Sequence, residues 1–170
     1  MKCLLASDKR RRCNEGLPKF QYYFRKAQES SGVLHRIYRF LYNKYAKKNG
    51  IEIPVQTKIG YGLYIGHPYC ITINPKAVIG NNCNIHRGVL IGQENRGDRK
   101  GCPNIGNNVW IGINSSIVGN ISIGDDVLIA PNSFVNCDVP SHSIVFGNPC
   151  KIKHRENATD GYINHMFSII

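Results

Sequence analysis

Isoleucine recurs at every sixth residue through most of the chain between positions 59 and 135. The first run shifts by two residues near position 72, and a gap interrupts the second run before position 105. The positions are Ile59, Ile65 and Ile71, then Ile73, Ile79, Ile85 and Ile91, then Ile105, Ile111, Ile117, Ile123, Ile129 and Val135. A period of six is too short for a helix-plus-strand unit, and it fits one short strand followed by one tight corner.

A second pattern gives the length of one turn of the coil. Residues 79–83, 105–109 and 123–127 share a motif in which Ile-Gly is followed by two Asn or Asp residues. The last two copies start 18 residues apart, and the first two start 26 apart because eight extra residues lie within 93–104. Ile can stack on Ile of the next coil, and Gly, Asn and Asp tolerate the positive φ that corners often need. We therefore predict a mainly β, triangular parallel β-helix over residues 51–153. A sandwich would instead alternate with period two.

The segment before the repeat is predicted to be helical and is strongly basic. Between residues 17 and 49, apolar residues recur at helical spacing on two faces separated by Ser30-Ser31-Gly32. These residues are Leu17, Phe20, Phe24 and Ala27, then Leu34, Ile37, Leu41 and Tyr45. Residues 1–50 hold 13 Lys/Arg and 3 Asp/Glu, whereas residues 51–170 hold 9 and 8. We expect this N-terminal segment to cap the first coil or to pack against another subunit, and nucleic-acid binding is not expected.

Composition argues against several other classes of protein. No run of 18 or more apolar residues occurs, so no membrane span is expected. The first residues lack the apolar stretch of a secretory signal, and we expect a cytoplasmic protein. The seven cysteines are odd in number and include no C-x-x-C pair, which argues against a disulfide framework and against a structural zinc site.

The repeats resemble the hexapeptide-repeat acyltransferase superfamily. In that superfamily the prism winds left-handed, against the usual right-handed crossover rule. The resemblance therefore implies a left-handed parallel β-helix with a short N-terminal helical segment. Residues 138–152, which read Asp-Val-Pro and then a Gly-Asn-Pro-Cys-Lys stretch, are similar to the segment that ends the prism near the coenzyme in many members. Residues 154–170 form a C-terminal tail, and we expect residues 155–170 to be partly disordered.

Within the superfamily, residues 51–153 are similar to the serine acetyltransferases. The stretch Gly62-Leu63-Tyr64-Ile65-Gly66-His67, residues 71–91, the loop and residues 102–106 align without gaps. The resemblance implies an O-acetyltransferase that uses acetyl-CoA and builds its sites between the subunits of a homotrimer. His67 occupies the position of the catalytic histidine. An imidazole base assists a weakly nucleophilic hydroxyl in attacking a thioester, although a structural corner histidine is the alternative.

The chain departs from the family pattern around the acceptor. The family has an aspartate where this chain has Gly66, and an Arg-His pair where it has Gly101-Cys102. Those family residues bind serine and orient the base, so the acceptor is either L-serine or a sugar hydroxyl. Candidate substrate-binding residues are Gly66, Asp98, Arg99 and Cys102, and Glu94 and Lys100 lie in the same loop. Solvated loop charges are the alternative interpretation of the charged residues.

The resemblance also indicates where the coenzyme would bind. In the family, the pantetheine arm lies beside small residues at successive corners. The matching residues here are Gly92, Gln93, Gly112, Ile113, Ala130 and Pro131. Lys151 and Lys153 are candidates for contacts with the coenzyme phosphates, or they are ordinary surface lysines.

Two other function classes remain open at this point. A metal lyase of the carbonic-anhydrase type needs three histidines that converge on zinc across a subunit interface. Only His67 and His86 lie in the repeats, so no metal is predicted and His86 is interpreted as structural. A non-catalytic prism that only binds or scaffolds is the third class, because a fold does not imply a function.

Overall fold

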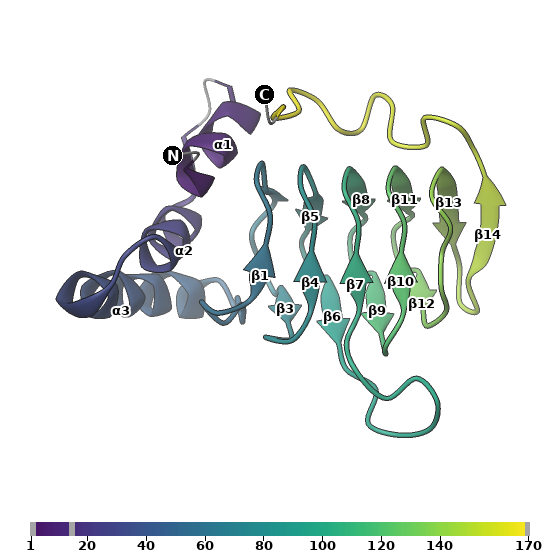
Figure 1. The fold of residues 1–170 in the computed structure, drawn as a ribbon, viewed down its shortest axis with the longest axis horizontal. Coiled ribbons are helices and arrows are strands. Elements are labelled where there is room, and N and C mark those ends of the chain that lie inside the picture. Colours follow the sequence, from purple (N-terminus) through teal and green to yellow (C-terminus); the bar gives the residue numbers. More distant parts are fainter. Residues whose placement is uncertain (1–2, 14–15, 169–170) are drawn as a thin grey trace.

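The computed structural model describes residues 3–13 and 16–168, which form a three-sided β-helix with helices at one end (Figure 1). The three sheets have the strand orders β1-β4-β7-β10, β12-β9-β6-β3 and β14-β13-β11-β8-β5-β2. The strands are β1 (Lys58–Ile59), β2 (Tyr64–Gly66), β3 (Thr72–Ile73), β4 (Val78–Ile79), β5 (Asn84–His86), β6 (Leu90–Gly92), β7 (Asn104–Ile105), β8 (Val109–Ile111), β9 (Ser116–Val118), β10 (Ser122–Ile123), β11 (Val127–Ile129), β12 (Phe134–Val135), β13 (Ser143–Phe146) and β14 (Lys151–His154).

The pairing register confirms the coil length read from the sequence. β10 pairs with β7, and β11 with β8, at a spacing of 18 residues. β9 pairs with β6 at a spacing of 26, because the eight-residue insertion lies between them. β5 pairs with β2 at a spacing of 20, so the two-residue shift belongs to the first complete coil. The pairs are parallel except for β13 with β14, and the predicted left-handed parallel β-helix is confirmed.

The repeated Ile-Gly-Asn-Asn motif forms one edge of the prism. The N–H of Asn81 donates to Oδ1 of Asn107 at 2.8 Å, and the N–H of Asn107 donates to Oδ1 of Asp125 at 2.6 Å. A Cβ on Gly80 would lie 2.5 Å from the carbonyl oxygen of Gly106, so this glycine is required by the close approach of two coils. Positive φ falls instead on Asn82, Asn108 and Asp126. The expected positive φ at these corners is therefore carried by the Asn and Asp residues, and the glycine serves the close packing of coils.

Three helices lie at the start of the prism: α1 (Leu4–Arg11), α2 (Lys19–Gln28) and α3 (Gly32–Lys48). Arg25 donates to the carbonyl oxygens of Ile59 at 2.9 Å and Gly60 at 2.6 Å. Its Nε lies 2.8 Å from Asp8 in α1, and both side chains are fully buried. Gln21 also donates to the Asp8 carboxylate, at 3.0 Å. The open end of a β-helix leaves backbone groups unpaired, and here side chains of α1 and α2 satisfy them. Helix α1 itself was not predicted.

The apolar faces of the helices agree with the prediction for α2 and differ for α3. Phe20, Phe24 and Ala27 are buried, whereas Leu34 and Ile37 are exposed. The contacts between α3 and α2 are made by aromatic rings: Tyr38 and Tyr45 stack on Tyr23, and Tyr42 packs on Phe24. Because aromatic rings bury more apolar area, they turn the helix away from the aliphatic face. None of the helices in the described part of the chain is long and apolar enough to cross a membrane.

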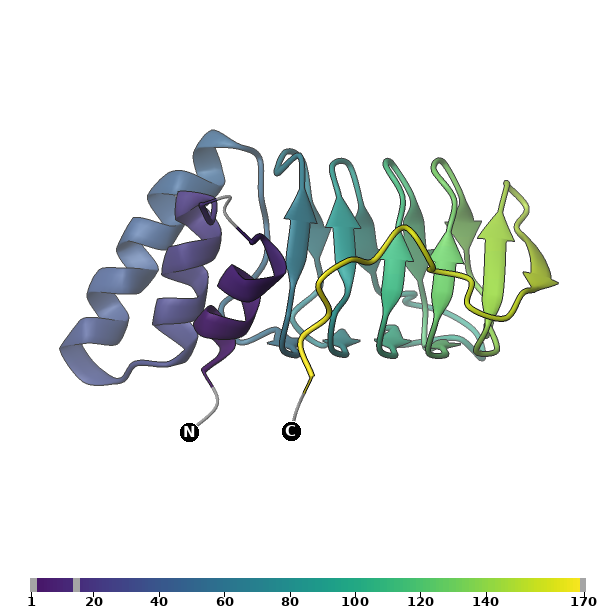
Figure 2. The same ribbon diagram turned by 90° about the horizontal axis from the view of Figure 1, so that it is seen from above.

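The C-terminal tail runs back along the prism from β14 to α1 (Figure 2). Thr159 donates to the Asp126 carboxylate through its N–H at 3.0 Å and its hydroxyl at 2.7 Å. Asn84 Nδ2 donates to the Tyr162 carbonyl at 3.1 Å. Polar side chains on the outer face of the prism therefore hydrogen-bond to the backbone of the tail at these positions.

We predict that Arg25→Met lowers the free energy of unfolding by about 3–5 kcal/mol, because it leaves the Asp8 carboxylate buried without its charged partner. Chemical denaturation followed by circular dichroism measures the loss. The matched control is Arg36→Met on the exposed side of α3, which should change the free energy by less than about 0.5 kcal/mol. Equal effects of the two substitutions would contradict the capping role of Arg25.

Candidate active site

His67 lies at the corner that follows β2, where the chain passes into the sheet that contains β3. Its backbone φ is +53°, a left-handed conformation that residues other than glycine rarely adopt. Its carbonyl oxygen accepts the N–H of Tyr69 at 2.8 Å, which closes a tight turn. The side chain is exposed. The fold therefore fixes the backbone of His67 and leaves its imidazole accessible to a ligand.

His86 lies next to His67, in the following coil. The register pairs His86 with Gly66, and the ring centroids of the two histidines are 6.4 Å apart. A Cβ on Gly66 would lie 2.7 Å from Cε1 and Nδ1 of His86. The His86 ring thus fills the space that a side chain at position 66 would need. The structure thus places three residues together: Gly66, His67 and His86. The sequence analysis had interpreted His86 as a structural residue.

The electrostatic environment keeps His86 neutral near pH 7. Partial burial lowers the pKa of His86, and positive charge on His67 lowers that pKa further. Its Nε2 atom is buried without a hydrogen-bond partner among the described residues. Within residues 3–13 and 16–168 of one chain, no group of three His, Cys, Asp or Glu side chains is placed to hold a metal ion.

Two aromatic residues that the sequence analysis did not single out extend the cluster. The Trp110 ring centroid lies 4.8 Å from that of His86, and Tyr162 of the tail packs edge-on against Trp110 at 5.1 Å. Trp110 could have been found from the sequence, because it is the one tryptophan and stands at an outward position between two buried repeat residues. Tyr162 had no such signal, since its place depends on the docking of the tail.

The expected coenzyme residues after β8 and β11 share an edge of the prism with His67. Gly112 and Ile113 follow β8, and Ala130 and Pro131 follow β11. The N–H of Asn132 donates to the Ile113 carbonyl at 2.9 Å, so the two corners are stacked directly. A Cβ on Gly112 would lie 2.6 Å from the Pro131 nitrogen, and glycine is therefore required there by coil packing alone.

The other expected coenzyme residues lie elsewhere on the prism. Gly92 ends β6 and Gln93 follows it, at the opposite edge of the sheet β12-β9-β6-β3 from His67. A Cβ on Gly92 would lie at an ordinary contact distance of 3.5 Å from a Val118 methyl group, so coil packing does not require glycine here. Lys151 and Lys153 are exposed on β14, the last strand, which is five strand spacings away from β2. In one chain these four residues do not lie beside His67.

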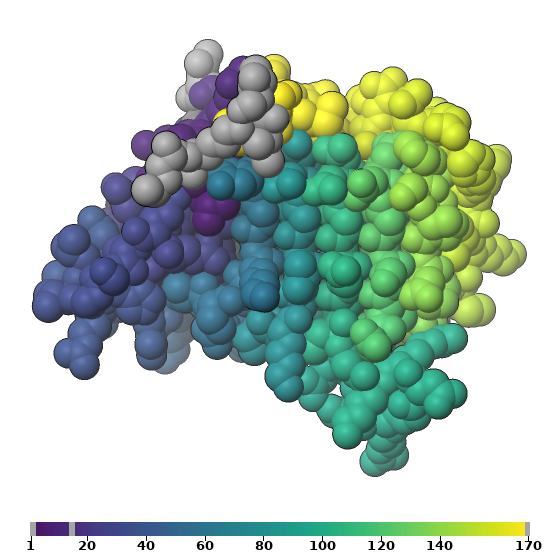
Figure 3. Space-filling model, in the orientation of Figure 1, coloured from purple at the N-terminus to yellow at the C-terminus, as the bar shows by residue number. Residues whose placement is uncertain are grey.

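The eight-residue insertion forms a loop that protrudes from the prism (Figure 3). Glu94 and Gly101 exchange two backbone hydrogen bonds of 3.0 Å at its base. The Arg99 carbonyl accepts the N–H of Asn120 at 2.9 Å, which ties the loop to the next coil. The loop is therefore anchored at its base and along one side.

The candidate substrate residues of this loop are not beside His67 in a single chain. Asp98, Arg99 and Cys102 follow β6 and leave the prism at the far edge of the sheet from His67. Burial raises the pKa of the Cys102 thiol, and the charge of Lys76 opposes this only in part. A raised pKa disfavours the thiolate, which is the nucleophilic form of cysteine.

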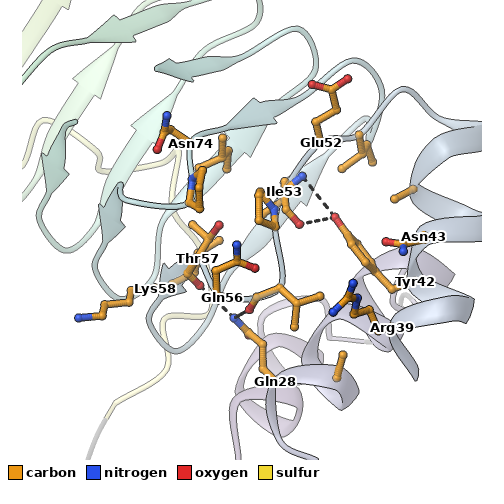
Figure 4. A pocket seen from close by; sticks show the side chains of 18 of the residues that line it. Gln28, Arg39, Tyr42, Asn43, Glu52, Ile53, Gln56, Thr57, Lys58 and Asn74 are labelled. Carbon is orange, nitrogen blue, oxygen red and sulfur yellow. Dashed lines mark hydrogen bonds between the residues drawn. The ribbon is translucent and has the colours of Figure 1, made fainter. Parts of the chain in front are cut away.

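A cavity of about 1500 Å³ lies between α3 and the first coil, away from the histidines (Figure 4). The Tyr42 hydroxyl donates to the Ile53 carbonyl at 2.5 Å, and Gln28 donates to the Thr57 carbonyl at 3.0 Å. Neither His67 nor any other histidine of the prism lines this cavity. We therefore place the candidate chemistry at the corner of His67 and not in this larger space.

Comparisons with known proteins point to one group. A family model described as "Bacterial transferase hexapeptide (six repeats)" matches residues 103–137. A serine acetyltransferase of Synechococcus elongatus is 34% identical over 116 residues, covering 68% of this chain and 48% of that protein. A serine acetyltransferase of Staphylococcus aureus is 34% identical over 139 residues, covering 82% of this chain and 62% of that protein.

Solved structures give the same picture. The crystal structure of Neisseria gonorrhoeae serine acetyltransferase in complex with serine is 30% identical, with a TM-score of 0.66. The match covers 89% of this chain and 66% of that one. The chain spans about half the length of the Synechococcus relative.

We predict that Gly66→Ala lowers the free energy of unfolding by about 1–3 kcal/mol, because the added Cβ overlaps the His86 ring. In a His86→Ala background the same change should cost close to nothing. Thermal or chemical denaturation of the four proteins in this double-mutant cycle measures the coupling. Additive effects would show that the His86 ring does not occupy the space beside position 66.

We also predict that His86 titrates below the usual range of a histidine, and that His67→Ala raises its pKa without restoring the usual value. The charge of His67 is removed by this change, whereas burial, the larger cause, remains. Nuclear magnetic resonance titration of the imidazole protons measures both values. A His86 pKa that is unchanged in His67→Ala would contradict the proximity of the two rings.

Proposed function

We propose that this chain, which belongs to the hexapeptide-repeat acyltransferase superfamily and to its serine acetyltransferase branch, transfers an acetyl group from acetyl-CoA to a hydroxyl. Its curated relatives are serine acetyltransferases, and one solved relative is described in complex with serine. Because the chain matches only about half of the Synechococcus relative, its activity and its acceptor are proposals that rest on the site itself.

The observation that carries the proposal is the position of His67. Its exposed imidazole stands on a strained corner, on the same edge of the prism as the stacked corners of Gly112 and Ala130. The His67 imidazole makes no hydrogen bond to another residue in the described part of the chain, and an accessible imidazole is the side chain that most often serves as a general base. The motif around His67 also aligns with that of the serine acetyltransferases.

The proton transfers of the reaction are assigned to His67. Bound acetyl-CoA would supply the acetyl group as an activated thioester. Neutral His67 would take the proton from the acceptor hydroxyl as its oxygen attacks, and imidazolium would return that proton to the departing thiolate. Protons and charge balance over the cycle, and the products are an acetyl ester and free CoA. General-base assistance of this kind typically contributes about 10²–10⁴-fold.

A homotrimer would complete the site. In one chain the loop residues Asp98 and Arg99, and the corner of Gly92, stand across a sheet from His67. A neighbouring prism packed against this sheet would bring its own loop toward His67 and form a groove between the two chains. Gly92, which carries no side chain, would leave room for a narrow coenzyme arm in that groove. Lys151 and Lys153 are candidates for its phosphates.

The acceptor is L-serine or a sugar hydroxyl. The relatives favour serine. Gly66 and Gly101-Cys102 favour a sugar, because the side chains that would hold an ammonium and a carboxylate group are missing at these positions. An acetylation assay that compares L-serine with a panel of neutral and acidic sugars separates these acceptors.

We predict that His67→Ala lowers kcat for acetyl transfer by about 10²–10⁴-fold, with a smaller change in KM for acetyl-CoA. Release of free CoA, followed with a thiol reagent, measures the rate. The control is His154→Ala, an exposed histidine on β14, which should leave the rate unchanged. A well-folded His67→Ala protein with full activity would contradict the mechanism, and sedimentation analysis of the same protein tests the trimer.

A further inference from the structure

The outer face of α3 carries apolar side chains that the described part of the chain leaves uncovered. Val33 is 71% exposed, Leu34 57%, Ile37 47% and Phe40 69%. Ile37 is three or four positions from each of the other three, so the four side chains lie together on one face of the helix. A contiguous group of exposed apolar side chains is typical of an interaction surface.

The packing of α3 directs this face away from the rest of the protein. Tyr42 and Ala46, on the opposite side of the helix, are buried, and His35 Nδ1 lies 2.9 Å from the carbonyl oxygen of Ala27 in α2. None of the four apolar residues lines the cavity between α3 and the first coil. Figures 1 and 2 show α3 as the outermost element at this end of the molecule. The outer face of α3 is therefore open to a partner.

Basic side chains flank the apolar residues. Arg36, Lys44 and Lys48 are exposed. Arg36 stands four residues before Phe40 and Lys44 four residues after it, so both lie next to the apolar group on the helix surface. Helix α3 contains five Lys or Arg residues and no Asp or Glu. In the described part of the chain, none of the ion pairs involves a lysine or arginine of α3.

The nearby acidic residues point elsewhere. Glu29 is the one acidic residue between positions 16 and 50. Its carboxylate accepts the N–H of Leu5 in α1 at 3.2 Å and the Cys3 thiol at 3.1 Å. Glu52 lines the cavity on the other side of α3. The outer face of α3 is thus apolar in its middle and positively charged at its borders.

We propose that the outer face of α3 binds the surface of an anionic lipid bilayer, with Val33, Ile37 and Phe40 in the interface and Arg36 and Lys44 beside the headgroups. A helix with Phe and Leu on one face and Lys and Arg around them binds in the plane of a membrane interface. Long basic side chains extend from such a face toward charged groups. The proposal does not depend on the acetyl transfer, because membrane binding is measured without turnover.

Charge argues against a second copy of the chain as the partner. If two α3 helices packed face to face, basic residues of one would meet those of the other, and neither helix has an acidic residue to pair with them. Residues 51–170 are close to neutral, with 9 Lys/Arg and 8 Asp/Glu, and have no excess of negative charge to offer. An anionic bilayer supplies an apolar phase and negative charge together.

Co-sedimentation of the full chain with lipid vesicles tests the proposal. One set of vesicles contains phosphatidylcholine alone, and the other contains phosphatidylcholine and phosphatidylglycerol in a ratio of about 7:3. At about 0.1 M salt we expect binding to the anionic vesicles to be at least tenfold stronger than to the neutral ones. At about 1 M salt we expect most of this difference to disappear, because the screening length falls from about 10 Å to about 3 Å.

Variants separate the apolar contribution from the electrostatic one. Ile37→Ser should weaken binding to the anionic vesicles at least fivefold. Lys44→Gln should weaken it about fivefold, because each basic residue near an anionic surface contributes about 1 kcal/mol. The matched controls are Ile152→Ser, at a residue that is 40% exposed on β14, and Arg155→Gln, at an exposed arginine just after it. Both controls should bind as the unchanged protein does, and circular dichroism verifies the fold of each variant.

Several results would overturn the proposal. These are equal binding to neutral and anionic vesicles, no binding to either, and equal losses in the controls and the α3 variants. Self-association that Ile37→Ser abolishes, in a protein that does not bind vesicles, would also overturn it, because the partner would then be a second copy of the chain. Sedimentation velocity of the two proteins measures that association.

Discussion

The stacking of one coil directly on the next is the constraint on which the rest of the structure depends. Each coil buries a row of Ile side chains, and Asn and Asp side chains at one corner accept the N–H groups of the coil before. Gly80 and its equivalents allow the backbones to approach within the distance that a Cβ would occupy. Since every coil repeats this arrangement, residues at equal positions in successive coils must lie side by side, and His67, His86 and Gly112 owe their places to it.

The periodic part of the chain could be predicted because its structure depends on local repetition. Period six in Ile and the 18-residue spacing of the corner motif determine the strands, the corners and the eight-residue loop. The flanks could not be predicted in the same way. Arg25 reaches the carbonyls of Ile59 and Gly60, and Asp126 holds Thr159, so these segments are placed by single polar contacts between residues that are distant in the sequence. Such contacts leave no periodic pattern in the sequence.

The candidate site, too, could be predicted only in part. His67 could be found because its motif resembles one family, but the partner of its ring could not be found from the family pattern. That pairing follows from the register: the first coil takes 20 residues, so position 66 meets position 86. The sequence contained this information in the shift from Ile71 to Ile73. Gly66 and His86 therefore depend on each other. The His86 ring, from the next coil, fills the space that a side chain at position 66 would occupy.

A bare prism offers flat faces and shallow corners. The segments on either side of the repeat change this on one face. The end of α1 carries Arg11 and Arg12 to the outer surface of β2, β5 and β8, and the tail returns to lay Tyr162 against Trp110. Arg11 binds the tail backbone at Asn164, so the basic helix and the tail hold each other in place. Part of the basic charge near the start of the chain, which has no role in the repeat, thereby gains a structural one: Arg11 joins the end of α1 to Asn84 of the prism and to the backbone of the tail.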